Sequence, residues 1–306
     1  MTTPNLKPKV TIVIPTYNHA PFLKQALASV VNQDFADWEA IVINNFSEDN
    51  TIQVVNSFQD PRIRLVNFRN NGCIAASRNE GVRLASSEYV AFLDSDDLWY
   101  PSKLSTCLAQ FTPEVSLVCH GLRFMFHGQL WKDVKYGPDN AVSYRSLLFK
   151  GNGFPPTALI VRKACLDKVG GFSENPDFIT AEDYELLLKL ARENFKFRFI
   201  QDVLGEYQWH SGNSSNSVLR QMNATLAVVT YHYENHLELE SFDALWLRRR
   251  RALIYCGFAR TFQRNRQKPE AWQLFLRSLR TFPFFLKIYA AIVLFCLSLL
   301  DKRFDK

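Results

Sequence analysis

The first ninety residues alternate between short β-branched runs and amphipathic stretches, and this alternation limits the fold more than any other feature. Apolar runs bounded by turn residues indicate strands, whereas apolar residues spaced three and four apart indicate helices. The pattern predicts strands at 10–14, 38–43, 63–66 and 89–93, with helices at 21–32, 51–58 and 75–85. We therefore expect an α/β fold in which helices cover both faces of a mostly parallel sheet.

Polar residues follow three of these predicted strands. In such a sheet, ligands bind outside the carboxyl ends of the strands. The three segments are Pro15-Thr16-Tyr17-Asn18, Asn44-Asn45-Phe46-Ser47-Glu48-Asp49 and Asp94-Ser95-Asp96-Asp97. We expect them to meet along one rim and to form the functional site.

The third segment places three carboxylates directly after an apolar strand. A hard divalent cation such as Mg²⁺ or Mn²⁺ would offset their repulsion and keep positions open for phosphate oxygens. The plainer alternative is that Asp94 and Ser95 only form a turn while Asp96 and Asp97 cap the next helix. A calcium loop fits poorly because the expected Gly and distal Glu are missing. An aspartyl nucleophile is a further alternative, which the mid-chain position of the run disfavours.

The pattern loosens after Trp99. It predicts a helix near 101–111, strands at 116–119, 122–127 and 157–161, and a helix from 180 to 191. Segments from about residue 217 are helical and basic, so we predict two parts, 1–216 and 217–306.

The charge of the chain is unevenly distributed. From residue 241 onward there are 14 Lys and Arg against 4 Asp and Glu, whereas residues 1–240 carry 22 against 26. An apolar segment, 281–300, follows the basic region, and this combination favours a lipid surface over nucleic acid. The uninterrupted apolar part, 288–300, would be about 20 Å long as a helix, against a hydrocarbon core of about 30 Å. We expect a surface or re-entrant membrane anchor; a full span and a buried packing helix are the alternatives.

Three further features of the sequence indicate the cellular compartment of the protein, the state of its cysteines and the class of partner. The N-terminus has no apolar signal-peptide core, so we expect a cytoplasmic protein. The six cysteines show no metal-like spacing, so reduced thiols are expected. Nucleic acid is not an expected partner, because Arg248–Arg251 lacks interleaved aromatic residues on a strand surface.

Taken in order, five segments resemble the motifs of family 2 glycosyltransferases, inverting enzymes of the A-type fold that transfer a sugar from a nucleotide donor. The resemblance covers roughly residues 10–217. The segments are Val13–Asn18, Gly72 with Ala75–Gly81, Glu88–Asp97, Gly170-Gly171-Phe172 with Glu182-Asp183, and Tyr207–Ser211 as a closing histidine loop.

The resemblance implies a Rossmann-like A-type fold, a Mg²⁺ or Mn²⁺ cofactor and roles for individual residues. Asp183 corresponds to the catalytic base, and the dipole of its helix is expected to keep it ionised. Asp96 and His210 would hold the metal, although His210 could instead be a surface-loop residue. Glu182 and Trp99 would lie on the acceptor side. The donor-binding residues would be Pro15, Thr16, Tyr17, Asn18, Asn44, Asn45, Ser47, Arg78, Asp94 and Ser95, with an intramolecular salt bridge as the alternative role of Arg78.

One segment departs from the family pattern, which has Asp-Asp-Gly where this chain has Asn44-Asn45-Phe46. Asn44 can accept a hydrogen bond through its amide oxygen but without charge assistance, which leaves the donor base open. The implied function is transfer of a sugar to a saccharide or lipid-linked acceptor, in cell-surface polysaccharide or glycolipid synthesis at the cytoplasmic face of a membrane. The alternative is a catalytically degenerate sugar-nucleotide-binding or scaffold protein.

Overall fold

The computed structural model describes residues 7–126, 128–151, 153–210, 217–284 and 286–300, with side chains up to residue 296. His127 and Ser211, which belong to two predicted segments, lie outside the described residues. The chain divides into two compact units. The first is Met1–Tyr144, Asn152–Pro176 and Glu182–Asn213; the second is Arg145–Gly151, Asp177–Ala181 and Ser214–Lys306.

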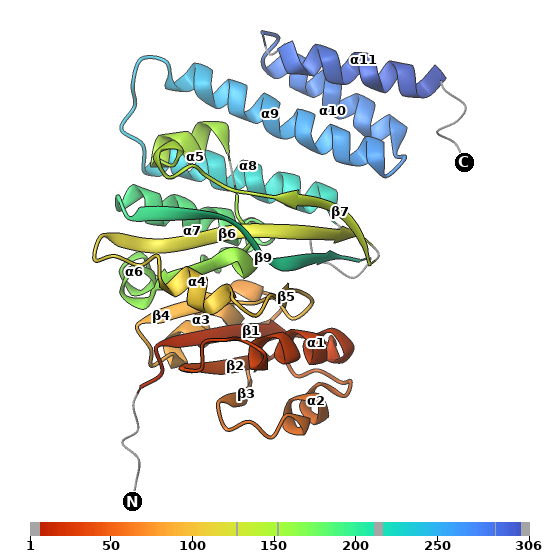
Figure 1. The fold of residues 1–306 in the computed structure, drawn as a ribbon. Coiled ribbons are helices and arrows are strands. Elements are labelled where there is room, and N and C mark those ends of the chain that lie inside the picture. The colour runs from red at the N-terminus through yellow and green to blue at the C-terminus, as the bar shows by residue number, and fades with distance from the viewer. Residues whose placement is uncertain (1–6, 127, 152, 211–216, 285, 301–306) are drawn as a thin grey trace, which may run out of the picture. The chain divides into compact units, whose positions relative to one another are not determined.

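The first unit is built on one mixed sheet (Figure 1). Its strands are β1 (Val10–Thr16), β2 (Trp38–Asn44), β3 (Ile63–Asn67), β4 (Tyr89–Phe92), β5 (Leu98–Trp99), β6 (Val115–Phe126), β7 (Gln129–Val134), β8 (Leu159–Arg162) and β9 (Lys196–Trp209). Within the described residues they follow the order β3-β2-β1-β4-β8-β6-β9-β5, and β7 pairs with β6. The pairs among β3, β2, β1 and β4 are parallel, as is β6 with β9, which confirms the predicted α/β class. The strands β8, β7 and β5 pair antiparallel with their neighbours.

The helices follow the strands in the expected rhythm up to β4. They are α1 (Ala20–Val31), α2 (Thr51–Ser57), α3 (Ile74–Leu84), α4 (Lys103–Leu108), α5 (Tyr144–Lys150), α6 (Lys163–Val169), α7 (Glu182–Arg192), α8 (Val218–Asn235), α9 (Asp243–Arg264), α10 (Lys268–Thr281) and α11 (Leu286–Leu300). Short 3₁₀ helices are η1 (Asp139–Ala141), η2 (Pro156–Ala158) and η3 (Pro176–Phe178).

Strand β1 shows how the two faces of the sheet are covered. Successive side chains of a strand point to opposite faces. Ile12 and Ile14 belong to the same buried cluster as Leu23 and Leu27 of α1. Val13 faces the other way, where a Cβ on Gly81 of α3 would come within 2.2 Å of its Cγ1. Helices α1 and α3 therefore cover opposite faces, as predicted.

The carboxyl ends of the central strands meet at one edge of the sheet. Thr16 of β1 pairs with Asn44 of β2. The Asn45 N–H donates to the Thr16 carbonyl at 3.0 Å, and the Leu93 N–H donates to the Val13 carbonyl at 3.1 Å. The three polar segments that follow these strands thus share the predicted rim.

Three local predictions were wrong in detail. The strands expected at 116–119 and 122–127 are one strand, β6, and the helix expected at 101–111 is the shorter α4. Strand β9 was not predicted, and it contains Tyr207–Trp209, which were expected in a loop. Its alternation is interrupted by register shifts against β6, which hide the period-2 pattern from the sequence.

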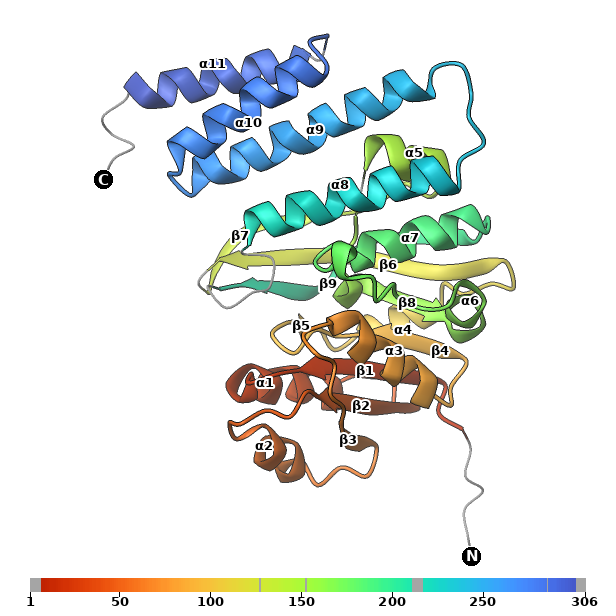
Figure 2. The ribbon, with the colours of Figure 1, turned by 180° about the vertical axis from the view of Figure 1, so that it is seen from behind.

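In the second unit, α9, α10 and α11 lie side by side (Figure 2). Helix α11 buries Ile288, Ala291 and Phe295. The Phe295 ring stacks on Trp272 of α10 at a centroid distance of 5.9 Å. Among the helices in the described ranges, none has both the length and the apolar character needed to cross a bilayer.

Candidate active site

The loops after β1 and β2 are tied to each other by reciprocal hydrogen bonds. The Asn18 N–H donates to the Ser47 hydroxyl at 2.9 Å, and the Asn18 amide oxygen accepts from the Glu48 N–H at 2.8 Å. Both loops need a left-handed residue, Asn18 at φ 52° and Phe46 at φ 55°. Tyr17 is 53% exposed beside this junction, whereas Pro15 and Thr16 are buried.

Asn44 does not face open space. Its side chain is fully buried, its Nδ2 donates to the Asn67 Oδ1 at 2.8 Å, and its Oδ1 accepts from the Ser47 N–H at 3.0 Å. Both ends of the amide are therefore used inside the chain. This geometry makes Asn44 a support of the loop, and its expected contact with the donor stays a prediction. Neighbouring Asn45 also accepts from the backbone, at the Asn70 N–H.

Residues 94–97 form a closed turn. The Asp97 N–H donates to the Asp94 carbonyl at 3.0 Å, and the next element is β5. The alternative in which Asp96 and Asp97 cap a helix is therefore wrong. The Asp97 carboxylate, 1% exposed, accepts from the Thr157 hydroxyl at 2.5 Å and from the Gln208 N–H at 2.9 Å. Burial, together with the Asp96 and Asp94 carboxylates, raises the pKa of Asp97 well above its usual range.

The structure brings together the two predicted metal ligands, Asp96 in the turn after β4 and His210 directly after β9. His210 Nε2 lies 3.0 Å from Asp96 Oδ2, and the imidazole stacks on Phe22 of α1 at a centroid distance of 4.5 Å. Burial and the nearby Asp94 carboxylate raise the pKa of Asp96. A carboxylate oxygen and an imidazole nitrogen in this negatively charged turn suit a divalent cation.

The described residues do not form a complete cage for such a cation. In the described part of the chain, no three His, Cys, Asp or Glu side chains are grouped to hold a metal ion. Mg²⁺ in nucleotide-dependent enzymes is commonly held by one or two carboxylates plus substrate phosphates, so the Asp96–His210 pair still fits this type of site.

Two residues beside this pair were missed by the sequence reasoning. His19 Nδ1 lies 3.1 Å from the hydroxyl of Ser95, and its ring centroid is 5.9 Å from that of His210. Phe22 supplies the stacking surface for His210. His19 could have been predicted as a site residue from its position directly after the Tyr17-Asn18 segment.

Arg78 joins the carboxylate turn to the start of α7. Its Nη2 donates to Asp94 Oδ1 at 2.7 Å, and its Nη1 donates to Glu182 Oε1 at 3.0 Å. The side chain is buried, and although burial opposes its charge, Asp94 and Glu182 raise the pKa of Arg78. The intramolecular salt bridge, one of two roles expected for Arg78, is present.

Asp183 lies in the first turn of α7 and is partly exposed. Its Oδ1 accepts from the Tyr184 N–H at 2.7 Å. Burial and the adjacent Glu182 raise the pKa of Asp183 to about 7, so the shift is opposite to the one expected from the helix dipole. The dipole effect is at most about 1–2 kcal/mol, and desolvation together with a like charge exceeds it here.

Asn79 links two of the sequence motifs, Ala75–Gly81 and Gly170–Phe172, by hydrogen bonds. Its Nδ2 donates to the Phe172 carbonyl at 2.9 Å, and its Oδ1 accepts from the Phe172 N–H at 2.8 Å. A Cβ on Gly171 would lie 2.4 Å from the Asn79 Oδ1, so the close approach requires glycine at 171. The α3 motif and the Gly170–Phe172 motif are therefore two sides of one contact.

Trp99 is not on an open acceptor side. It is 3% exposed within the core cluster, and its indole N–H donates to the Thr157 carbonyl at 2.9 Å. Trp99 is the second residue of β5, and its ring returns into the core, so the structure offers no support for its predicted acceptor-side role.

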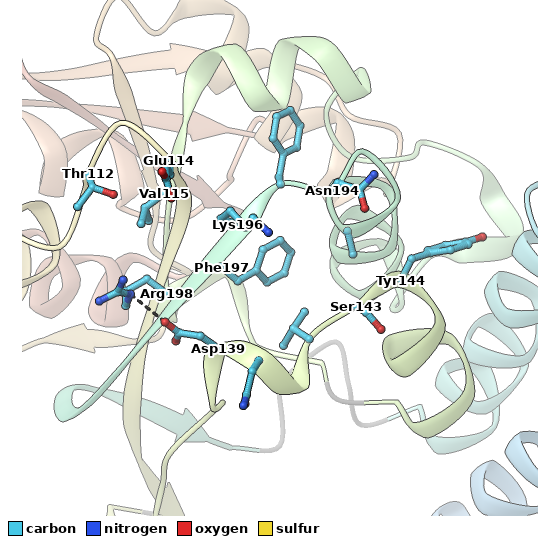
Figure 3. Close-up of a pocket in the computed structure, with 14 residues that line it drawn as sticks. Thr112, Glu114, Val115, Asp139, Ser143, Tyr144, Asn194, Lys196, Phe197 and Arg198 are labelled. Carbon is cyan, nitrogen blue, oxygen red and sulfur yellow. Dashed lines mark ion pairs between the residues drawn. The ribbon is translucent and has the colours of Figure 1, made fainter.

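The first unit also contains a cavity of about 540 Å³ (Figure 3). It is lined by residues that include Glu114, Tyr144 and Lys196, and the ion pair of Arg198 with Asp139 crosses its edge at 2.9 Å. None of the predicted site residues lines it.

Comparison with known proteins identifies the family. Residues 11–170 match the family described as "Glycosyl transferase family 2". The chain belongs to this family. Family 2 membership agrees with the order of the five sequence motifs, and the expected A-type glycosyltransferase fold is confirmed.

Three proteins illustrate the similarity. The chain is 30% identical over 226 residues to a hyaluronan synthase of Pasteurella multocida, covering 69% of this chain but 21% of the synthase. It is 29% identical over 186 residues to the Escherichia coli UDP-Glc:alpha-D-GlcNAc-diphosphoundecaprenol beta-1,3-glucosyltransferase WfgD, covering 60% and 70%. The mannosyltransferase PcManGT of Pyrobaculum calidifontis, solved with GDP-Man and Mn²⁺, shares the fold at a TM-score of 0.63 and 19% identity, covering 100% and 84%. The chain thus spans about a fifth of the length of the first relative.

Proposed function

We propose that this chain is an inverting glycosyltransferase that moves a sugar from a nucleoside-diphosphate donor to a saccharide or lipid-linked acceptor. The observation that carries the proposal is the double ion pair of Arg78. By binding Asp94 and Glu182 together, Arg78 holds the start of α7, with Asp183, beside the carboxylate turn at the rim of the sheet. Sugar transfer by this family needs a base near a group of carboxylates that can hold a cation, and this rim has both.

In this mechanism Asp183 accepts the proton of the acceptor hydroxyl as that oxygen attacks the sugar. A base is most effective when its pKa lies near the working pH, and a pKa of about 7 meets this condition. Asp96 and His210 would hold Mg²⁺ or Mn²⁺, which supplies positive charge for the diphosphate leaving group. A single displacement of this kind needs no covalent intermediate.

The donor nucleotide is assigned to the loops after β1 and β2. Thr16, at the end of β1, has a buried hydroxyl with no hydrogen-bond partner among the described residues. Tyr17 and Phe46 are exposed aromatic rings at the same loops, and the Arg69 guanidinium lies 5.1 Å from the Phe46 ring centroid. Asn18, Asn45 and Ser47 shape the backbone of these loops, while Asp94 and Ser95 line the turn beside them.

The names of two relatives support the proposed acceptor class. WfgD is named as a glucosyltransferase that uses UDP-Glc and a diphosphoundecaprenol-linked sugar, and hyaluronan synthase is named for a polysaccharide. We assign this chain to the same general task, the assembly of a cell-surface polysaccharide or glycolipid in the cytoplasm.

We also propose that the second unit contacts the membrane surface through α11. The helix is predominantly apolar, yet Leu286, Tyr289, Val293 and Leu294 are between 47% and 82% exposed. The same unit carries the basic excess noted above, including exposed Lys287. An exposed apolar helix beside basic side chains matches a bilayer with anionic lipids better than water.

Vesicle co-sedimentation tests this contact. We expect the intact protein to bind vesicles of equimolar phosphatidylcholine and phosphatidylglycerol, and to bind less after Leu286→Glu with Val293→Glu. Leu130→Glu, at an exposed position of β7 in the first unit, is the matched control and should not change binding. Equal binding by all three proteins would refute the assignment to α11.

Turnover tests the transferase proposal. Wild type is expected to release nucleoside diphosphate from one of the common sugar nucleotides in the presence of Mn²⁺, and Asp183→Asn should lower this rate by about 100- to 10,000-fold while still binding the donor. Normal turnover by Asp183→Asn would remove the base assignment. Donor binding without turnover in wild type, across a range of saccharide and lipid-linked acceptors, would favour the scaffold alternative.

A further inference from the structure

Thr157, which no sequence motif singled out, contacts the carboxylate turn and Trp99. It lies in η2, just before β8, and its side chain is fully buried. Pro155 and Pro156 precede it and restrict the backbone that presents it. Thr157 is about sixty positions from the carboxylate turn in sequence, so its contacts with that turn are purely tertiary.

The hydroxyl of Thr157 contacts both ends of the carboxylate turn, residues 94–97. It donates to Asp97 Oδ2 at 2.5 Å and accepts from the Asp94 N–H at 3.2 Å. Asp97 in turn closes the turn through its own N–H, which donates to the Asp94 carbonyl. Asp96, the proposed metal ligand, is therefore held between two residues that share a single buried partner.

The same group of contacts extends to the other proposed ligand. The second oxygen of Asp97 accepts from the Gln208 N–H at 2.9 Å, two residues before His210. On the opposite side, the Thr157 carbonyl accepts from the Trp99 indole at 2.9 Å, which fixes the exit of the turn into β5. The hydrogen bonds of Thr157 and Asp97 thus hold the two segments that place His210 Nε2 3.0 Å from Asp96 Oδ2.

We propose that Thr157 is a positioning residue that keeps Asp96 and His210 in the geometry for binding a divalent cation with the donor diphosphate. This inference rests on the proposed function. Without the hydroxyl, Asp97 and the Asp94 N–H each lose a buried partner, and the turn that carries Asp96 is free to rearrange. Sites whose ligands depend on such outer contacts typically lose 10- to 100-fold in metal affinity when the contact is removed.

The test compares Thr157→Val, which keeps the shape but removes the hydroxyl, with Thr157→Ser, which keeps the hydroxyl. Mn²⁺ binding is titrated directly by electron paramagnetic resonance in the presence of nucleoside diphosphate. We expect the dissociation constant for Mn²⁺ to rise about 10- to 100-fold in Thr157→Val and to remain within about threefold of wild type in Thr157→Ser. The same ratio should appear in the Mn²⁺ concentration for half-maximal turnover, while the rate at saturating Mn²⁺ changes less.

Thr11→Val is the matched control for lost stability. Thr11 is also fully buried and donates to a carboxylate, Glu39 Oε1 at 2.7 Å, but it lies at the opposite end of β1. We expect Thr11→Val to lower the melting temperature without changing Mn²⁺ binding. Unchanged Mn²⁺ binding in Thr157→Val, or an equal loss in both valine variants, would overturn the inference. Absence of metal-dependent nucleotide binding in wild type would instead contradict the proposed function.

Discussion

Arg78 Nη2 lies 2.7 Å from Asp94 Oδ1, and this contact places a permanent positive charge directly against the carboxylate turn. The same guanidinium holds Glu182, so one buried side chain of α3 connects β4 with α7. The buried Glu182 carboxylate and the partly buried Asp94 carboxylate can lie at the rim together because the Arg78 cation lies between them.

Arg78→Met should destabilise the first unit. Removing one partner of a buried ion pair leaves uncompensated charge and typically costs about 3–5 kcal/mol. The free energy of unfolding from urea titration measures this loss. Arg83→Met is the control on the same helix, because Arg83 is 67% exposed and pairs with Glu80 in the adjacent turn. A small effect at Arg78, equal to that at Arg83, would show that the buried ion pair does not support the site.

The activity should depend on pH through Asp183. Because the pKa of Asp183 is raised to about 7, the base is protonated and inactive at lower pH. We expect kcat/KM to rise about tenfold per pH unit below about pH 7 and to level off above it. Glu182→Gln removes the neighbouring charge that raises this pKa, so the rising limb should move to lower pH. A midpoint near pH 4 in wild type would contradict the raised pKa.

Lys103 gives a stability prediction that is independent of function. Its ammonium is fully buried, lies 3.5 Å from the Trp99 ring centroid, and has no hydrogen-bond partner among the described residues. Burial lowers the pKa of Lys103 to about 7, against 10.5 normally. Between these values the unfolded chain holds a proton that the folded chain does not, so stability falls as pH decreases from about 10.5 to about 7.

Lys103→Met removes that proton-linked penalty. The variant should be more stable than wild type at pH 7, on the order of a few kcal/mol, and the gain should shrink as pH rises towards 10. Thermal denaturation at a series of pH values measures it. Lys24→Met, at an exposed position of α1, serves as the control and should show neither the gain nor its pH dependence. A pH-independent difference would mean that the ammonium is charged in the folded state.

Asn44→Leu should weaken the loop after β2. The change leaves the Ser47 N–H and the Asn67 Oδ1 without their partners, at a cost of about 1–3 kcal/mol for a buried unsatisfied group. We expect lower stability in urea and a higher KM for the donor. The matched control is Asn50→Leu, because Asn50 is exposed and makes no side-chain cap bond to α2. A raised KM for the donor with unchanged stability would instead indicate that Asn44 binds the donor directly.

The parts of this fold that were predictable are those with a strong local pattern. Strand β1 and helix α1 carry clean β-branched and 3.6-residue periods, and both appear within two residues of the expected bounds. Strand β9 was missed because bulges and polar residues interrupt its alternation. A strand of this kind is defined by its partners, β6 and β5, and not by its own sequence.

Some residues of the candidate site could likewise be predicted from the sequence, and others could not. Asp96 and His210 could be named from motifs, and the structure brings them within 3.0 Å of each other. Thr157 could not be named, because a buried threonine after two prolines has no pattern that marks it. The raised pKa of Asp183 was also out of reach, since it depends on burial and on the direction of Glu182, which only the packing determines.

The central claim is that the rim binds a sugar nucleotide together with a divalent cation, and thermal-shift measurements test it most directly. UDP, GDP, dTDP and CMP, with their common sugar conjugates, are compared with and without Mn²⁺ on wild type and on Asp96→Ala. A ligand at a hundredfold over its dissociation constant adds about 2.7 kcal/mol of stability. The account predicts that one nucleotide raises the melting temperature only with Mn²⁺ and only when Asp96 is present. Equal shifts in wild type and Asp96→Ala, or no shift with any nucleotide, would contradict it.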